Sequence, residues 1–224
     1  MAQQDPAGGL FEALRDGAGG VWTDYVDHRF VRGLGDGTLP GAAFRRYLTQ
    51  DYLFLIHFVR AHALAGYKST QLDDLADAAA GMSALLAEMR LHVGYCAEWG
   101  LDEAGMAAEA EAVETVAYTR YVFERGTAGD LLDLHVVLAP CIMGYAEIGA
   151  ALAGRTGPGN PYAAWIEAYA GAEYQEAARQ AAAALDRVGR RGGASGRMPA
   201  LQAQFDLAVR LESAFWDMGW RAGA

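Results

Sequence analysis

Cys141 and Tyr145 stand four residues apart in an apolar stretch of the sequence, Leu138–Gly149. Residues i and i+4 of a helix are neighbours on its surface, so the thiol and the phenol ring would face one space. A cysteine thiolate attacks electrophilic carbon, and a nearby carboxyl group can move the protons that attack and departure require. A cysteine taken alone is nevertheless more often a small buried hydrophobic residue than a nucleophile. Whether Cys141 is a nucleophile or a core residue therefore depends on which side chains lie beside it.

Three apolar helical stripes carry a polar residue at the same place. The same offsets (0, 3, 4, 7, 10, 11 and 14) recur in residues 44–58, 134–148 and 205–219. The fourth position of these stripes is Asp51, Cys141 and Glu212. A carboxylate within an apolar stripe is costly unless it is paired or hydrogen-bonded. Because the three helices must share one core, the pattern predicts a buried polar pocket.

Each of these three residues also has a structural explanation. Asp51 could accept a hydrogen bond from a tyrosine or arginine, and Glu212 could pair with an arginine. Two acids would raise the pKa of a nearby thiol, so either one acid is protonated or proton transfer accompanies attack. His135 precedes Cys141 by six residues and lies on another face, so a cysteine–histidine pair is not predicted.

Aromatic residues fall on the inward helix faces around this predicted pocket. The candidates are Phe54, Tyr118, Tyr145 and Tyr169. Flat rings around a polar cluster suit a planar heteroaromatic ligand, which can stack between two of them. Ordinary aromatic core packing explains any one of them equally well.

Helical periodicity accounts for most of the chain. Helices are expected at residues 9–32, 41–67, 70–98, 102–125, 130–153, 161–169, 172–188 and 198–221. Glycine-rich loops are expected at residues 33–40, 126–129, 154–161 and 189–196, with Asn160 as an N-cap and Pro161 as the first helical residue. No segment shows the alternation typical of a strand. The sequence therefore predicts one all-α domain, a helical bundle over residues 1–224 with a loose tail at residues 1–8.

Composition excludes several classes of partner. The net charge is −10, from 18 basic and 28 acidic residues, which argues against nucleic acid and anionic membrane surfaces as partners. Cys96 and Cys141 form neither a CxxC pair nor a disulfide framework, so a reducing, cytoplasmic location is expected. No uncharged apolar run reaches the length of about 18–20 residues that a membrane span needs.

Five motifs occur in order along the chain. They are GLGDGTLP at 33–40, FxxYLxQD at 44–51, PCxxxYxEIG at 140–149, NPYxxWIxxY at 160–169 and ExxFW at 212–216. Each is weak alone, but together they closely resemble the TenA/thiaminase II family over about residues 10–221. These are aminopyrimidine aminohydrolases of thiamin salvage with a haem-oxygenase-like, all-helical fold.

The resemblance implies specific roles for the residues that match. Cys141 would be the nucleophile that adds to the pyrimidine ring, and Glu212 would shuttle protons. Asp51 would bind the ring nitrogen and the exocyclic amine. The stacking aromatics would be Phe54 and Tyr145, supported by the tyrosines Tyr118 and Tyr169. Family members without the cysteine use a glutamate instead, so this chain matches the cysteine type.

The reaction implied by the resemblance is hydrolytic release of ammonia from 4-amino-5-aminomethyl-2-methylpyrimidine, which gives the hydroxymethylpyrimidine. Thiamin would be cleaved by the same groups, and which of the two substrates is preferred stays open. The resemblance implies a homotetramer that binds a small pyrimidine and needs neither a metal nor an organic cofactor.

Two alternatives remain open on the same fold. A metal-dependent oxygenase would need converging His and carboxylate ligands. Glu88 and His92 are the best pair, but their i, i+4 spacing differs from the i, i+3 spacing usual in helical bundles, so a structural pair is favoured. His28 is a conceivable haem ligand without further support. The other alternative is a non-catalytic protein that binds a small ligand.

Overall fold

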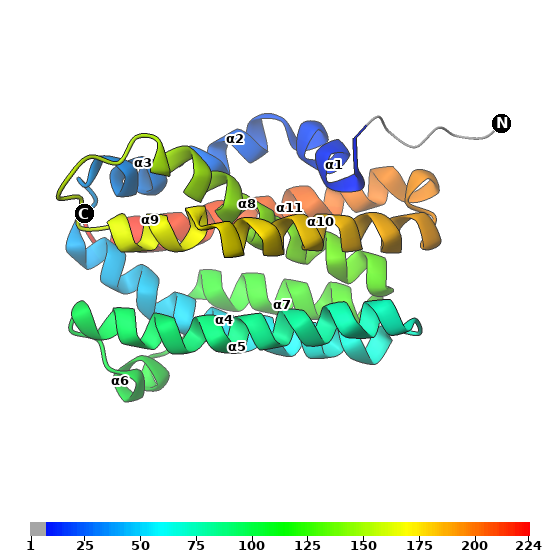
Figure 1. Ribbon diagram of the computed structural model, residues 1–224, viewed down its shortest axis with the longest axis horizontal. Coiled ribbons are helices and arrows are strands. Elements are labelled where there is room, and N and C mark those ends of the chain that lie inside the picture. Colours follow the sequence, from blue (N-terminus) through cyan, green and yellow to red (C-terminus); the bar gives the residue numbers. More distant parts are fainter. Residues whose placement is uncertain (1–7) are drawn as a thin grey trace.

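The computed structural model describes residues 8–224 and shows a bundle of α-helices (Figure 1). No strand occurs among the described residues, which confirms the all-α prediction. The helices in this part of the chain are α1 (Leu10–Ala18), α2 (Gly20–Val26), α3 (Arg29–Asp36), α4 (Gly41–Lys68), α5 (Leu72–Glu98), α6 (Glu103–Ala108), α7 (Val113–Ala128), α8 (Leu131–Ala153), α9 (Ala163–Ala170), α10 (Ala172–Arg191) and α11 (Ala194–Arg221). Apart from Gly8, the expected tail at residues 1–8 lies outside the described residues.

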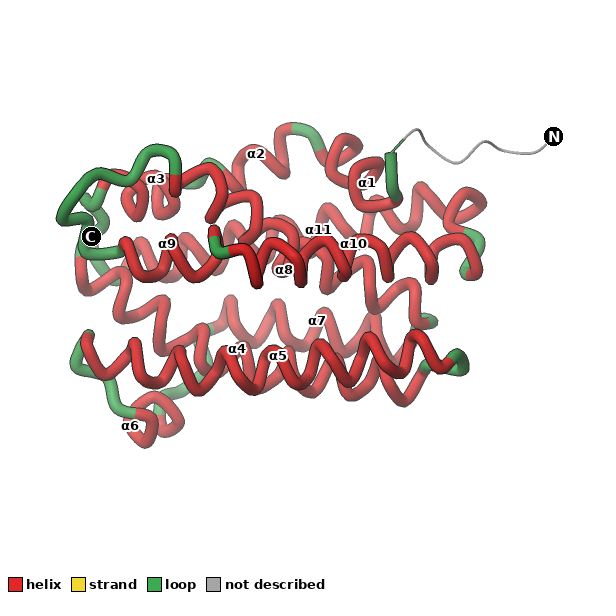
Figure 2. The backbone as a smooth tube through the Cα atoms, in the orientation of Figure 1, coloured by secondary structure: helices red, strands yellow, loops and turns green. Residues whose placement is uncertain are grey.

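Short loops at the ends of the bundle connect the long helices (Figure 2). α4 and α5 run antiparallel along one side, and α9 and α10 follow one another along the other (Figure 1). α8 lies between them and packs against α7, α9, α10 and α11. By length and mean hydropathy α8 could cross a membrane, but 67% of its most apolar window is buried inside the structure, as in any core helix.

The start of α8 is fixed by a reciprocal cap. The Asp130 carboxylate accepts a hydrogen bond from Asp133 N at 3.1 Å, and the Asp133 carboxylate accepts one from Asp130 N at 2.8 Å. Such a capping box satisfies backbone donors that a helix start leaves free. Arg197 of α11 donates to both carboxylates at 2.6 Å. This cluster therefore sets where α8 begins and holds it against α11.

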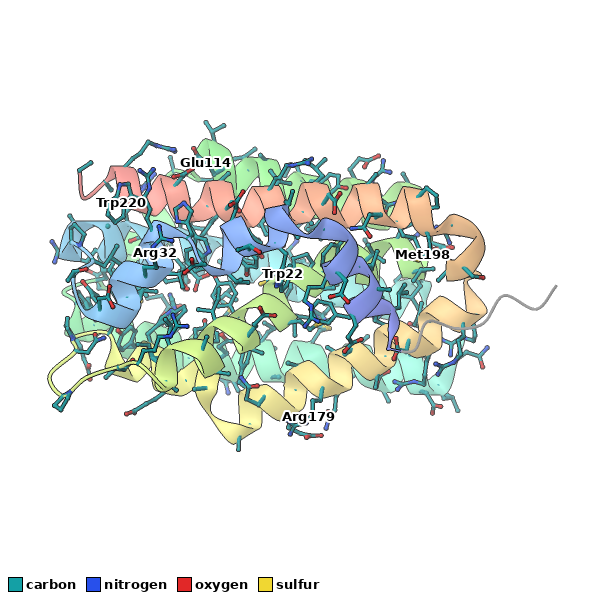
Figure 3. The ribbon with its side chains drawn as sticks, turned by 90° about the horizontal axis from the view of Figure 1, so that it is seen from above. Trp22, Arg32, Glu114, Arg179, Met198 and Trp220 are labelled. Carbon is teal, nitrogen blue, oxygen red and sulfur yellow. The ribbon has the colours of Figure 1, made fainter. Side chains whose placement is uncertain are left out.

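An aromatic layer fills the space between α8, α11 and the first three helices. Figure 3 shows α1–α3 lying over these two helices, with Trp22 near the middle. The Trp22 ring stacks on Phe205 at 5.7 Å, and its indole N–H donates to Glu147 of α8 at 3.2 Å. Gly144 lets α2 approach α8, because a Cβ at this position would overlap the Tyr25 ring.

The glycine-rich segment 33–40 was predicted as a loop, and this is wrong for residues 33–36, which belong to α3. The helix ends at Gly37, whose φ of 71° is left-handed. Asn160 stabilises this last turn of α3, because its side-chain amide donates to the carbonyls of Leu34 and Gly35 at 2.8 and 2.9 Å. The predicted helix over residues 9–32 is instead divided among α1, α2 and α3.

Other boundaries also differ from the prediction. The single helix expected at 102–125 is two helices, because Gln50 binds the extended link between them: its amide donates to Ala110 O at 3.1 Å and accepts from Ala112 N at 2.7 Å. Gly126 lies within α7, packed against leucine side chains of α4 and α8. The expected turn at 189–196 shrinks to Gly192 and Gly193 between α10 and α11.

The predicted N-cap at Asn160 is displaced by two residues. α9 begins at Ala163, with Tyr162 as its N-cap residue, so Pro161 precedes the helix. The Asn160 side chain still accepts a hydrogen bond from Tyr162 N at 2.8 Å. It thus caps the turn that leads into the helix while its amide group holds the end of α3.

Candidate active site

A cavity of about 320 Å³ lies between α4, α5, α8 and α10. One end of it is lined by polar and aromatic side chains, namely Asp51, Glu88, Cys141, Tyr145 and Tyr169. Asp51 comes from the middle of α4 and Cys141 from the middle of α8, as their matching positions on two apolar stripes predicted. The structure therefore brings a carboxyl group and the thiol to the wall of one cavity.

Glu212 of α11 completes the predicted set without lining the cavity itself. Its side chain is 2% exposed, accepts a hydrogen bond from the Tyr118 hydroxyl at 2.8 Å and hydrogen-bonds the Cys141 thiol. Burial raises the pKa of Glu212 to about 8, although the bond from Tyr118 acts in the opposite direction. Near pH 7 this group is therefore mainly a neutral acid that can donate a proton.

Asp51 is buried and only partly satisfied. Among the described residues, its Oδ2 atom has no hydrogen-bond partner, and the nearest ring nitrogen of His92 is 3.7 Å away. Burial raises the pKa of Asp51 to about 7, opposed by a hydrogen bond from Tyr47. Since buried polar atoms are normally hydrogen-bonded, an unpaired carboxyl oxygen at a cavity wall is suited to a ligand that supplies a donor.

The sequence matches the model of the TENA/THI-4/PQQC family over residues 16–222. The chain belongs to this family. An aminopyrimidine aminohydrolase from Halalkalibacterium halodurans is 35% identical over 211 residues, which cover 93% of this chain and 94% of that protein.

Two solved structures place this family member among known folds. A protein described as a TenA family transcription regulator, from Silicibacter sp. TM1040, is 44% identical, with a TM-score of 0.91 and coverage of 96% of this chain and 98% of that one. A domain from Shewanella denitrificans described as having a heme oxygenase-like fold matches at a TM-score of 0.72 and 14% identity, over 94% of this chain and 91% of that chain. The haem-oxygenase-like fold prediction is confirmed.

In this TENA/THI-4/PQQC family member, both cysteines have raised pKa values for one main reason, which is burial. Cys96 lies in the core with 0% exposure, and its pKa rises to about 12. The pKa of Cys141 is raised well above its ordinary value by burial and then by the nearby acids Glu212, Asp51 and Glu88. The resting thiol is therefore protonated, and proton transfer has to accompany its attack. The sequence left two possibilities open, that one acid is protonated or that proton transfer accompanies attack. The neutral Glu212 supports the first, and the protonated thiol supports the second.

Glu88 is a cavity residue that the sequence reasoning treated as structural. Its carboxylate accepts a hydrogen bond from Tyr169 at 3.2 Å, and burial, followed by the charge of Asp51, raises its pKa to about 7. His92 instead reaches the Leu48 carbonyl at 3.1 Å. The sequence could have indicated Glu88, because it shares a face of α5 with Gly81 and other small residues. Small side chains on that face leave room for a cavity. No three His, Cys, Asp or Glu side chains form a metal-binding group within residues 8–224 as described.

The four predicted aromatic residues fall into two groups. Tyr145 and Tyr169 line the cavity, with their rings 4.9 Å apart in an edge-to-face arrangement. Phe54 and Tyr118 are not among its lining residues; they pack against each other at 5.1 Å, beside Glu212. Tyr174 of α10 lines the cavity and was not predicted. The site therefore has a wall that faces the cavity, formed by Tyr145, Tyr169 and Tyr174, and a supporting layer behind it.

Proposed function

We propose that the protein hydrolyses 4-amino-5-aminomethyl-2-methylpyrimidine to the hydroxymethylpyrimidine and ammonia, and that it cleaves thiamin at the same site. The observation that carries this proposal is the Cys141 thiol, which is hydrogen-bonded to Glu212 and shares a cavity wall with Asp51. The name of the Halalkalibacterium relative supports the same reaction class.

Recognition of the pyrimidine ring rests on Asp51 and the tyrosines. The unpaired Oδ2 of Asp51 can accept a hydrogen bond from the exocyclic amine, and the protonated form can donate one to a ring nitrogen. A pKa of about 7 makes both forms available near neutral pH. Tyr145 offers a flat surface at the same end of the cavity.

The chemical step uses Cys141 as nucleophile and Glu212 as its acid–base partner. Addition of sulfur forms an S–C bond to the ring, while the thiol proton passes to Glu212 in its ionised form, which is the minor form near pH 7. The C–N bond of the aminomethyl arm then breaks, and the amine leaves with the electron pair. Water adds to the methylene carbon, the S–C bond breaks, and the proton returns to sulfur. The net change is addition of water and release of ammonia.

Ammonia release from the aminopyrimidine, measured with and without a chelator, tests this proposal. We expect turnover without added metal, and near abolition of turnover in Cys141→Ser. Activity that requires iron and resists alkylation of Cys141 would favour an oxygenase. Binding of the pyrimidine without turnover in the wild type would favour a non-catalytic role. Undiminished turnover in Cys141→Ser would remove the nucleophile from the proposal.

A further inference from the structure

The cavity continues well beyond the residues that the proposed reaction uses. Its far end is lined by His62 of α4, His135 of α8 and Asp77 of α5. His62 follows Asp51 by eleven residues on one helix, which is about 16 Å at a rise of about 1.5 Å per residue. His135 precedes Cys141 by six residues, or about 9 Å on the same basis. A single pyrimidine ring at Cys141 would leave this end empty.

The two histidines at the far end are half-buried and have no hydrogen-bond partners within the described residues. Neither ring makes a hydrogen bond to another residue in the described part of the chain, although both line the cavity. Gly81 leaves the space that the His62 ring occupies, because a Cβ there would lie 2.5 Å from Nδ1. Burial lowers the pKa of both histidines. Each is therefore a neutral ring with one N–H donor and one acceptor nitrogen.

Charges at this end balance within the protein. Asp77 forms an ion pair with Arg187, and the buried Asp74 forms one with Arg191. Because each arginine is offset by its own carboxylate, no net positive charge is available to a phosphate group. A neutral hydrogen-bonding group such as a hydroxyl can instead donate to one imidazole and accept from the other.

The section between the two ends is apolar. Phe58, Leu85 and Leu138 contribute to it, and α10 faces it with small side chains such as Ala181. Such a passage suits an aromatic or aliphatic group with no strong hydrogen-bonding needs of its own. The cavity is thus polar at both ends and apolar in the middle.

We propose that the far end is a second subsite, which binds the leaving group of the substrate. The leaving group that fits is an amine or nitrogen heterocycle, apolar along its length and ending in a neutral hydroxyl or similar group held by His62 and His135. This inference rests on the proposed function, because it places the pyrimidine at Cys141. It predicts that pyrimidines with such a large leaving group are substrates in their own right.

The bond changes are those of the proposed reaction. The C–N bond breaks between the pyrimidine methylene and the leaving nitrogen, which keeps the electron pair, and water supplies the hydroxyl group. For a quaternary nitrogen such as that of thiamin, the heterocycle leaves neutral and one proton goes to solvent. For a primary ammonium arm, the leaving group is the ammonium ion.

The test compares two substrates that differ only in the leaving group. Thiamin carries a hydroxyethyl-substituted heterocycle, whereas the aminopyrimidine releases only ammonia. We expect His62→Leu and His135→Leu each to lower kcat/KM for thiamin about tenfold, the usual effect of one lost hydrogen bond in a binding site. The same variants should change kcat/KM for the aminopyrimidine less than about twofold.

Two further variants guard against a general structural effect. Ala181→Leu narrows the middle of the cavity and should lower kcat/KM for thiamin tenfold or more while sparing the aminopyrimidine. His57→Leu removes a histidine of the same helix α4 that does not line this cavity and should leave the ratio of the two substrates unchanged.

Three results would overturn the subsite. The first is an equal loss for both substrates in the histidine variants, the second is no loss for either, and the third is a clear preference for thiamin monophosphate over thiamin. If the wild type turns over neither substrate, the proposed function fails. Calorimetry then tests the subsite separately, with thiamin expected to bind about tenfold more weakly to His135→Leu than to the wild type.

Discussion

The two sides of α8 are filled in opposite ways. On the side of α2 and α11, Gly144 admits the Tyr25 ring, and Trp216, which is 0% exposed, stacks on Phe30 at 5.0 Å. On the side of α4, α5 and α10, the helix faces a cavity in which a buried oxygen of Asp51 is unpaired. The first side is filled by aromatic rings, although the Trp216 Nε1 atom there also has no hydrogen-bond partner within residues 8–224, whereas the second side keeps open volume beside the acid and thiol groups. Glu212 of α11 links the two sides, because it hydrogen-bonds the Cys141 thiol from the packed side. The faces of α8 therefore differ in how densely they are packed: the aromatic layer supplies stability, and the open cavity leaves room for chemistry.

The two cysteines give the strongest test of this difference. Cys141→Ser should lower kcat for ammonia release about a thousandfold or more, because a hydroxyl is a far weaker nucleophile than sulfur. Cys96→Ser should leave kcat within about twofold, since Cys96 is fully buried in the core and does not line the cavity. Both thiols are raised in pKa by burial, so neighbours rather than burial distinguish them. Similar losses in both variants would contradict this.

A matched pair of phenylalanines tests the packing side. Phe205, at 0% exposure, lies among Phe11 and Trp22, whereas Phe58, at 3% exposure, borders the cavity. Phe205→Ala should cost about 3–5 kcal/mol of unfolding free energy, and Phe58→Ala clearly less, because part of its surface already lacks packing partners. Urea unfolding measures both values. Equal losses would mean that the cavity wall is as well packed as the aromatic layer.

Glu212→Gln should show that the buried Glu212 carboxyl lowers the free energy of unfolding of the wild type. The pKa of Glu212 is about 8 in the folded protein and about 4.3 in an unfolded chain. Between these values the folded state holds a proton that the unfolded state releases, so this group lowers stability as pH rises from about 4 to 8. The variant should therefore gain on the order of 4–5 kcal/mol over the wild type at pH 8 and almost nothing at pH 4.

Urea unfolding of both proteins at several pH values measures this gain as a difference between wild type and variant. The difference is needed because His62, with a pKa lowered to about 4 by burial, destabilises the fold in the opposite direction, as pH falls below about 6.5. A gain that does not depend on pH would show that Glu212 is ionised in the folded protein.

The sequence predicted the central features of this site because they follow helical periodicity. Asp51, Cys141 and Glu212 occupy one register on three apolar stripes, and an acid stands out against such a background. Glu88 did not stand out, since α5 is amphipathic and carries many other polar residues. The glycine segment at 33–36 was misread because Asn160, more than a hundred residues away, holds its carbonyls. A contact between residues so far apart in the chain cannot be predicted from the residues next to the segment.

Glu88 supports a smaller and more specific prediction, because it is the acid across the cavity that the chemical step leaves unused. A primary ammonium arm on the pyrimidine carries a positive charge near this carboxylate, and a charged hydrogen bond contributes about 1.5–3 kcal/mol. Glu88→Gln should therefore raise KM for the aminopyrimidine about tenfold while kcat changes little. Because the pKa of Glu88 is about 7, the difference should be largest at pH 8 and small at pH 6. Affinity for the neutral hydroxymethyl product, measured by calorimetry, serves as the internal control and should not change. A loss of affinity shared equally by both ligands would mean that Glu88 only holds Tyr169 in place.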